Sequence, residues 1–79
     1  MPIDPSAVIA PTARIHPEAR IGAQTVIGDY AVVESDVTVG AFCRIEPYVY
    51  IKRWTTLGDY NEISAGAVLG TDPFDKVFT

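Results

Sequence analysis

The strongest constraint in this chain is an aliphatic residue at every sixth position. The series runs without a gap and consists of Ile3, Ile9, Ile15, Ile21, Ile27, Val33, Val39, Ile45, Ile51, Leu57, Ile63 and Leu69. A helix, with about 3.6 residues per turn, and a free-standing strand, with a period of two, both drift out of phase with such a pattern. A short fixed period of this kind indicates a solenoid of stacked, nearly identical coils.

A column of small residues accompanies the aliphatic column. Four residues after each aliphatic stand Ala7, Ala13, Ala19, Thr25, Ala31, Val37, Cys43, Val49, Thr55, Asn61, Ala67 and Pro73. We expect each hexad to form one side of a triangular prism, so that about 18 residues complete a coil. Residues one coil apart then stack, and the interior consists of three apolar ladders, one of which contains Ile9, Ile27, Ile45 and Ile63.

Two further positions of the hexad carry characteristic residues. Glycine directly follows the aliphatic at Gly22, Gly28, Gly40, Gly58 and Gly70, where we expect the chain to bend. Aromatic side chains follow the aliphatic by three residues at Tyr30, Phe42, Tyr48, Trp54 and Tyr60, and we expect them to point outward. The coil length predicts stacking of Tyr30 with Tyr48 and of Phe42 with Tyr60. Exposed aromatic patches of this kind typically mark a partner surface, here a subunit contact, with ligand contact or unrelated surface residues as the alternatives.

The charge balance excludes several classes of function. Ten acidic and six basic residues give a net charge of -4, and the basic residues are too scattered for the stripe that nucleic acid or an anionic membrane requires. No apolar run approaches the roughly 20 residues that cross a bilayer, and the first residues do not form a signal peptide. We therefore expect a cytoplasmic protein with no membrane span, and the single cysteine agrees with that compartment.

Three residues have side chains that are capable of chemistry of their own. Cys43 lies in the small inward column, so we expect a structural role rather than that of a nucleophile. Asn61 is the only amide in that column; we expect it to be buried and to bond backbone at a corner, with a substrate contact as the alternative. His16, the only histidine, is expected at a surface corner, and one histidine does not supply the three protein ligands of a catalytic zinc. The sequence predicts no metal, no cofactor and no catalytic residue.

The complete hexad pattern (aliphatic, small or glycine, two variable positions, small, variable) resembles the hexapeptide repeat of left-handed parallel β-helix acyltransferases. The resemblance covers the whole chain and implies an all-β fold, a single-stranded left-handed parallel β-helix of about four triangular coils. It also implies a homotrimer with active sites in the clefts between neighbouring prisms. The left-handed sense comes from the resemblance alone, because crossover connections in general prefer the right-handed sense.

Several stretches resemble one branch of that superfamily, the UDP-N-acetylglucosamine O-acyltransferases of lipid A synthesis. They are residues 9–13, 27–30, 57–63 and 69–70, of which residues 57–63 read Leu-Gly-Asp-Tyr-Asn-Glu-Ile. In that branch a hydroxyacyl chain passes from acyl carrier protein to the sugar. A loop of the family's type follows here, in which Pro73, Asp75 and Phe78 match. The resemblance makes Asp75 a sugar contact, and Phe74 stands where the family has glutamine.

The resemblance also sets limits on what this chain does. We expect the β-helix to occupy residues 3–74 and residues 71–79 to begin a substrate-type loop without a cap. Family members are about three times as long, and their catalytic histidine matches no residue here, so we expect the 79-residue chain alone to be inactive. The alternatives are a non-enzymatic trimeric scaffold or another hexapeptide acyltransferase. The zinc carbonic anhydrase branch of the same fold is disfavoured by the histidine count.

Overall fold

The structure, a computed structural model, describes residues 3–70. Each strand in this range has two residues and contributes one outward and one inward side chain. In chain order they are β1 (Val8–Ile9), β2 (Arg14–Ile15), β3 (Arg20–Ile21), β4 (Val26–Ile27), β5 (Val32–Val33), β6 (Thr38–Val39), β7 (Arg44–Ile45), β8 (Tyr50–Ile51), β9 (Thr56–Leu57), β10 (Glu62–Ile63) and β11 (Val68–Leu69). The inward residue is always the aliphatic of the repeat, which is why the strands recur every six residues.

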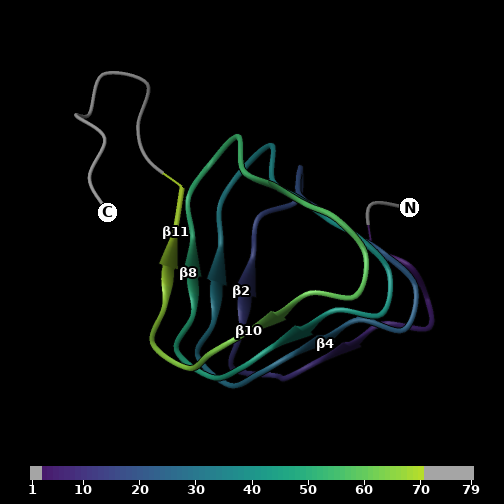
Figure 1. Ribbon diagram of the computed structural model, residues 1–79, viewed down its shortest axis with the longest axis horizontal. Coiled ribbons are helices and arrows are strands. Elements are labelled where there is room, and N and C mark those ends of the chain that lie inside the picture. Colours follow the sequence, from purple (N-terminus) through teal and green to yellow (C-terminus); the bar gives the residue numbers. More distant parts are fainter. Residues whose placement is uncertain (1–2, 71–79) are drawn as a thin grey trace.

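Three parallel sheets form the sides of a triangular prism (Figure 1). Sheet A contains β3, β6 and β9, sheet B contains β1, β4, β7 and β10, and sheet C contains β2, β5, β8 and β11. Ile3 extends sheet A through an isolated bridge to Ile21. Every register joins residues one 18-residue coil apart, for example Ile9 with Ile27 and Ile27 with Ile45. The predicted all-β fold, coil length and ladders are confirmed.

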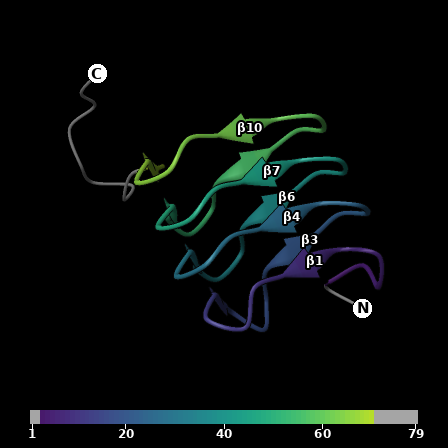
Figure 2. The ribbon, with the colours of Figure 1, turned by 90° about the horizontal axis from the view of Figure 1, so that it is seen from below.

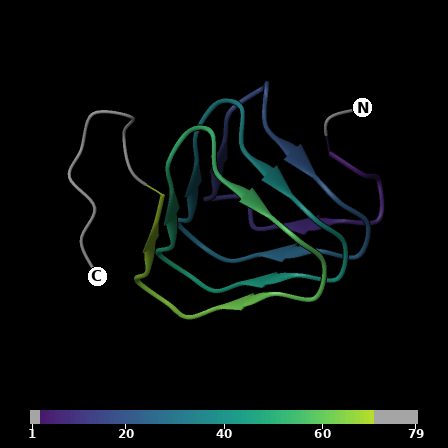
Figure 3. The ribbon, with the colours of Figure 1, turned by 45° about the horizontal axis from the view of Figure 1, so that its top comes forward.

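The coil is left-handed, as the resemblance implied. In Figure 1 the chain runs leftward through β10, upward through β11 and from the top down to the right through sheet A, which is a clockwise path. Figure 2, seen from below, shows that later coils lie nearer the viewer of Figure 1. A clockwise path that approaches the viewer is left-handed, and the tilted view in Figure 3 shows the same winding around an open triangle.

The interior of the middle coils is closed to solvent. Its apolar residues are at most 2% exposed: Ala19, Ile21, Ile27, Ala31, Val33, Val37, Val39, Cys43, Ile45, Val49 and Ile51. Thr25 is the buried polar residue of this set, and its hydroxyl donates to the Gly40 carbonyl at 2.7 Å and accepts from the Cys43 amide at 3.1 Å. Ladder residues of the first and last coils are only partly buried, because a described coil covers them on one side alone.

The turns lie at the second and third residues after each aliphatic, one step later than predicted. Pro11 and Thr12, for example, form the turn that follows Ile9. The expectation that glycine marks the bends is therefore wrong for Gly22, Gly28, Gly40 and Gly58, which precede the turns.

Gly22, Gly28 and Gly40 are needed because adjacent coils approach each other there. A Cβ atom on Gly22 would lie 2.5 Å from the backbone carbon of Gly40, and one on Gly28 would lie 2.7 Å from the Pro47 nitrogen. Gly58, in contrast, has only the Asn61 side chain nearby, at 4.0 Å. Glycine therefore permits the close contact between coils rather than the bend of the chain.

The third residue after the aliphatic adopts a left-handed backbone at seven non-glycine positions. These are Gln24, Tyr30, Asp36, Phe42, Tyr48, Trp54 and Tyr60, with φ between 58° and 66°. This conformation costs an L-residue about 1–2 kcal/mol. Hydrogen bonds between coils offset the cost, since the amides of Tyr48 and Tyr60 each donate at 2.9 Å to carbonyls of the preceding coil.

Candidate functional site

The outward side of sheet C, which we call face C, contains a hollow. It has a volume of about 810 Å³. Its lining comes from β2, β5, β8 and the turns that follow them: Arg14, Ile15, His16, Pro17, Val32, Val33, Glu34, Ser35, Tyr50 and Arg53. Aliphatic, charged and aromatic residues all contribute to this lining.

Glu34 is the centre of the polar network in this hollow. Its carboxylate accepts the Tyr50 hydroxyl through one oxygen and the Arg53 amide at 2.9 Å through the other. The guanidinium of Arg53 lies over the Trp54 ring, 4.7 Å from the ring centroid. One carboxylate therefore connects the second coil to the third and orients the rim of the hollow.

The pKa of Glu34 is lowered from its ordinary value by this arrangement. The Tyr50 hydroxyl is the largest cause, the Arg53 amide is the second, and the positive charges of Arg53 and Lys52 add to them. Each of these groups stabilises the carboxylate relative to the protonated acid. Glu34 is therefore ionised at neutral pH and serves as an acceptor within the hollow.

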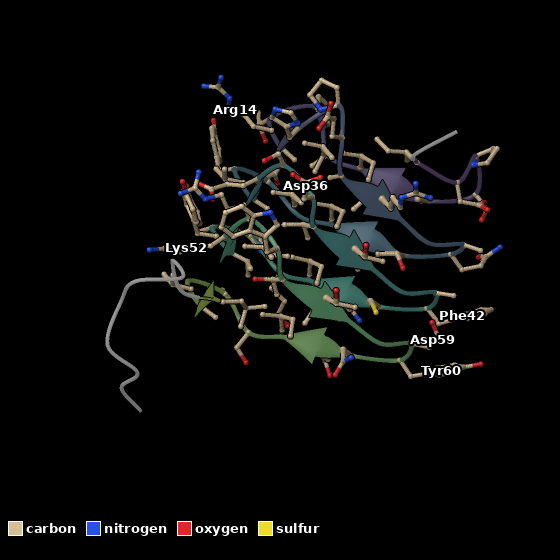
Figure 4. The ribbon with its side chains drawn as sticks, turned by 90° about the horizontal axis from the view of Figure 1, so that it is seen from above. Arg14, Asp36, Phe42, Lys52, Asp59 and Tyr60 are labelled. Carbon is tan, nitrogen blue, oxygen red and sulfur yellow. The ribbon has the colours of Figure 1, made fainter. Side chains whose placement is uncertain are left out.

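The fold brings together three basic residues that are far apart in the sequence. Arg14 and Arg53 line the same hollow, and Lys52 lies close enough to Glu34 to affect its pKa. Figure 4 shows Arg14 and Lys52 on the same side of the prism. Positions 14 and 52 differ by about two coils and so share a face, whereas Arg20 on β3 and Arg44 on β7 lie on the other two sheets.

His16 lies at an exposed corner on the rim of the hollow, as predicted. Its Nδ1 accepts a hydrogen bond from the amide of Glu18 at 3.0 Å. An amide can only donate, so the neutral ring carries its proton on Nε2.

The two other candidates from the small column have different outcomes. Cys43 is buried, and its sulfur lies 3.1 Å from the Gly58 carbonyl oxygen, in agreement with the predicted structural role. Asn61 does bond backbone at a corner, with its Nδ2 donating to the Gly58 carbonyl at 2.9 Å. The predicted burial of Asn61 is wrong, because it lies in the last described coil and is exposed.

Four of the aromatic side chains form stacked pairs on two edges of the prism, and Trp54 lies on the third edge, between β8 and β9. The AB corner, which joins sheet A to sheet B, carries Phe42 and Tyr60 with ring centroids 5.2 Å apart. The BC corner, which joins sheet B to sheet C, carries Tyr30 and Tyr48 with centroids 5.4 Å apart. Both predicted stacks are confirmed, and all four rings are at least 52% exposed.

The predicted sugar contacts Phe74 and Asp75 lie outside the described residues, as do residues 71–79 of the predicted loop and the end of the predicted β-helix at residue 74. Within residues 3–70, no group of three His, Cys, Asp or Glu side chains is placed to hold a metal ion. The same part of the chain contains no helix long and apolar enough to cross a membrane.

Coils of six-residue sides, an aliphatic ladder and a small inward column define a parallel β-helix of the hexapeptide-repeat class. The family described as "Bacterial transferase hexapeptide (six repeats)" matches this chain over residues 19–53 and again over residues 36–71. Together the two matches span more than half of the sequence, and the chain belongs to this family. No individual curated protein matches it.

Proposed function

We propose that this β-helix is part of an acyltransferase that moves a hydroxyacyl chain from acyl carrier protein to UDP-N-acetylglucosamine, the step that begins lipid A synthesis. The observation that carries the proposal is the match of residues 19–71 to the transferase hexapeptide family. The finer choice of substrate rests on the resemblance of residues 57–63 and of the loop after Gly70.

Residues 57–63 form the last part of β9, the AB corner and β10. Asp59 accepts the amide of Ala41 at 2.8 Å, and Asn61 donates to the carbonyl of Gly58. The Asp59 bond joins the corner to the preceding coil, and the Asn61 bond closes the corner on itself. This stretch therefore supports the family assignment because its side chains build the corner between two strands of a hexapeptide coil. The proposed sugar contacts remain Asp75 and Phe74.

The reaction needs a base that takes the proton of the attacking sugar hydroxyl and a donor that stabilises the oxyanion formed from the thioester. We assign neither role to residues 3–70. His16 is the only histidine of the sequence, and its Nδ1 is engaged by its own turn. The proposal therefore includes substrate binding by the 79-residue chain without turnover.

We also propose that the chain works as a homotrimer, the assembly that the resemblance implies. Four exposed aromatic rings in two stacked pairs support this part of the proposal, since exposed aromatic patches are typical of partner surfaces. A trimer places clefts between prisms, where a carrier protein and a sugar nucleotide can both reach one site.

The test is a titration of the isotopically labelled chain with UDP-N-acetylglucosamine, followed by NMR, with UDP-glucose as the matched ligand. We expect saturable shifts with the first sugar, and about tenfold weaker binding after Asp75→Asn, the loss of one charge-assisted hydrogen bond. Asp72→Asn is the charge-matched control in the same loop and should leave binding unchanged.

Two other results would contradict the proposal. If a stable trimer binds neither UDP-N-acetylglucosamine nor hydroxyacyl carrier protein, the non-enzymatic scaffold is the better reading. If the 79-residue chain turns these substrates over, its base lies within the sequence and the expectation of an inactive chain fails. Release of free carrier-protein thiol, measured with a thiol reagent, detects such turnover.

A further inference from the structure

The hollow on face C lies where the outward column of sheet C changes from large to small side chains. Arg14 pairs with Val32 and Val32 pairs with Tyr50, so these three outward residues stand in one column, one coil apart. Neighbouring coils are about 4.8 Å apart, which places Val32 midway between two long side chains. The short Val32 side chain therefore leaves space between Arg14 and Tyr50, and the hollow occupies that space.

The side of the hollow nearer the later coils is an ordered aromatic wall. The Tyr50 hydroxyl donates to Glu34, and the Arg53 guanidinium lies 4.7 Å from the centroid of the Trp54 ring. Tyr50 is nevertheless 36% exposed, so part of its ring remains accessible within the hollow. This side therefore offers a flat apolar surface beside a fixed polar network.

Three other side chains of the lining carry donors for which residues 3–70 provide no acceptor. The Arg14 guanidinium has no hydrogen-bond or ion-pair partner in that part of the chain, and neither has the Ser35 hydroxyl. The Nδ1 atom of His16 accepts the Glu18 amide, so the Nε2–H of the neutral ring is the donor that His16 can offer. A guanidinium, a ring N–H and a hydroxyl in one hollow suit the recognition of an oxyanion.

The charges around the hollow favour an anion through direct contact rather than through long-range attraction. The lining contains two guanidinium groups and one carboxylate, that of Glu34, which already accepts two hydrogen bonds. Glu18 and Asp36 lie in turns on the neighbouring edge, outside the lining, and offset the positive charges. In Figure 4 the Arg14 side chain extends away from the ribbon. An anionic group therefore gains most from a charge-assisted contact with Arg14 itself.

We propose that this hollow binds a small molecule that combines one carboxylate or phosphate group with a flat apolar body. The oxyanion pairs with the Arg14 guanidinium and accepts the hydrogen bonds of His16 and Ser35. The flat body lies on Val32 and against the Tyr50 ring. The volume of about 810 Å³ lies within the range of small-molecule sites, roughly 300–1,000 Å³. The predicted substrate loop takes no part, so this site is separate from the proposed acyl transfer.

Titration of the isotopically labelled 79-residue chain, followed by NMR, tests the site with three probes of similar shape. Phenyl phosphate and benzoate carry the two kinds of oxyanion, and benzamide is the neutral control. We expect saturable shifts at Val32, Ser35 and Tyr50 with at least one anion, with a dissociation constant in the millimolar range because the probes are small. Benzamide should bind at least about tenfold more weakly, since it carries no charge for Arg14. The tighter of the two anions identifies the group that the site prefers.

Two substitutions and a matched control locate the binding. Arg14→Gln should weaken anion binding by about tenfold or more, because it removes the charge-assisted contact. Arg20→Gln is the control, since Arg20 is also an exposed outward strand residue but belongs to sheet A, and it should leave binding unchanged. Val32→Phe fills the hollow without changing any charge and should also abolish saturable binding. Circular dichroism verifies that each variant keeps its fold.

Several results would overturn the site. They are the absence of binding by both anions, equal losses in Arg14→Gln and Arg20→Gln, undiminished binding by Val32→Phe, and competition between the bound anion and UDP-N-acetylglucosamine. Competition would show that the hollow belongs to the sugar-nucleotide site. Failure of UDP-N-acetylglucosamine to bind the chain would instead contradict the proposed function and leave the anion site intact, so the two failures are distinguishable.

Discussion

The middle coils and the flanking coils have the same hexad but different interiors. Between Ala19 and Ile51 the inward side chains are at most 2% exposed, whereas Ile3, Ile9, Ile15, Leu57, Ile63 and Leu69 are partly buried. The difference shows that burial in this fold depends on whether a coil has neighbours on both sides. Residues of the same type at equivalent positions of the repeat therefore make unequal contributions to stability.

The largest expected effect comes from truncating one ladder at two heights. Ile45→Ala, in the middle of the stack, should lower the free energy of unfolding by about 3–4 kcal/mol, because a closed core cannot refill the lost volume. Ile9→Ala, in the first coil of the same ladder, should cost about half as much or less. Denaturant unfolding followed by circular dichroism measures both. Equal losses would show that the first coil is as well packed as the third.

A pair of glycines, one after β6 and one after β9, sharpens the same comparison. A Cβ atom on Gly40 would lie 2.7 Å from the backbone carbon of Gly58, whereas a Cβ on Gly58 meets only the Asn61 side chain at 4.0 Å. Gly40→Ala should therefore destabilise by about 1–3 kcal/mol through overpacking. Gly58→Ala should be neutral or stabilising by up to about 1 kcal/mol, because it restricts the unfolded chain. Thermal unfolding of the two variants measures both changes in stability. A destabilised Gly58→Ala variant would indicate that another coil packs over that position.

The smallest expected effect concerns two carboxylates, each of which accepts a hydrogen bond from a backbone amide at a corner of the following coil. Glu34 accepts from Arg53 and Glu46 from Ala65, but Glu34 also accepts the Tyr50 hydroxyl. The pKa of folded Glu34 is lowered, so its ionised form stabilises the protein above the unfolded pKa, and this stability is lost as the pH falls through the folded pKa. Glu34→Gln should cost less than about 1 kcal/mol at pH 7, since the site is partly exposed.

Unfolding measured from pH 7 down to the acid range tests this sign. The difference between wild type and Glu34→Gln should shrink on acidification, while Glu46→Gln, which lacks the tyrosine bond, serves as the matched control. A difference that grows toward low pH would contradict the assigned network.

Much of the fold could be predicted from the sequence because one register governs it. The aliphatic period fixed which residues point inward, and the coil length placed Tyr30 beneath Tyr48 and Phe42 beneath Tyr60. The position of the turn was misjudged, because glycine is compatible both with a bend and with a close approach of two coils. Only the distance from Gly22 to the next coil distinguishes these causes.

The candidate site was less predictable. Cys43 and His16 were placed correctly because their hexad positions decide between interior and corner. The Glu34 network was missed, although Tyr50 and Arg53 follow Glu34 by about one coil and the stacking rule could have found them. Asn61 was misjudged because its exposure depends on the end of the described stack rather than on its column.

The sequence by itself determined the architecture of this protein, because an aliphatic residue at every sixth position is compatible with one kind of stacked coil. The resemblance of that hexad supplied the left-handed sense, which the views of the structure confirm. The tertiary structure decided which residues meet on a face: Arg14, Glu34, Tyr50 and Arg53 around one hollow, and four aromatic rings along two edges. The physical reason is that stacking joins residues 18 apart, so each surface collects side chains from several coils and its charge and shape emerge only when the coils are assembled.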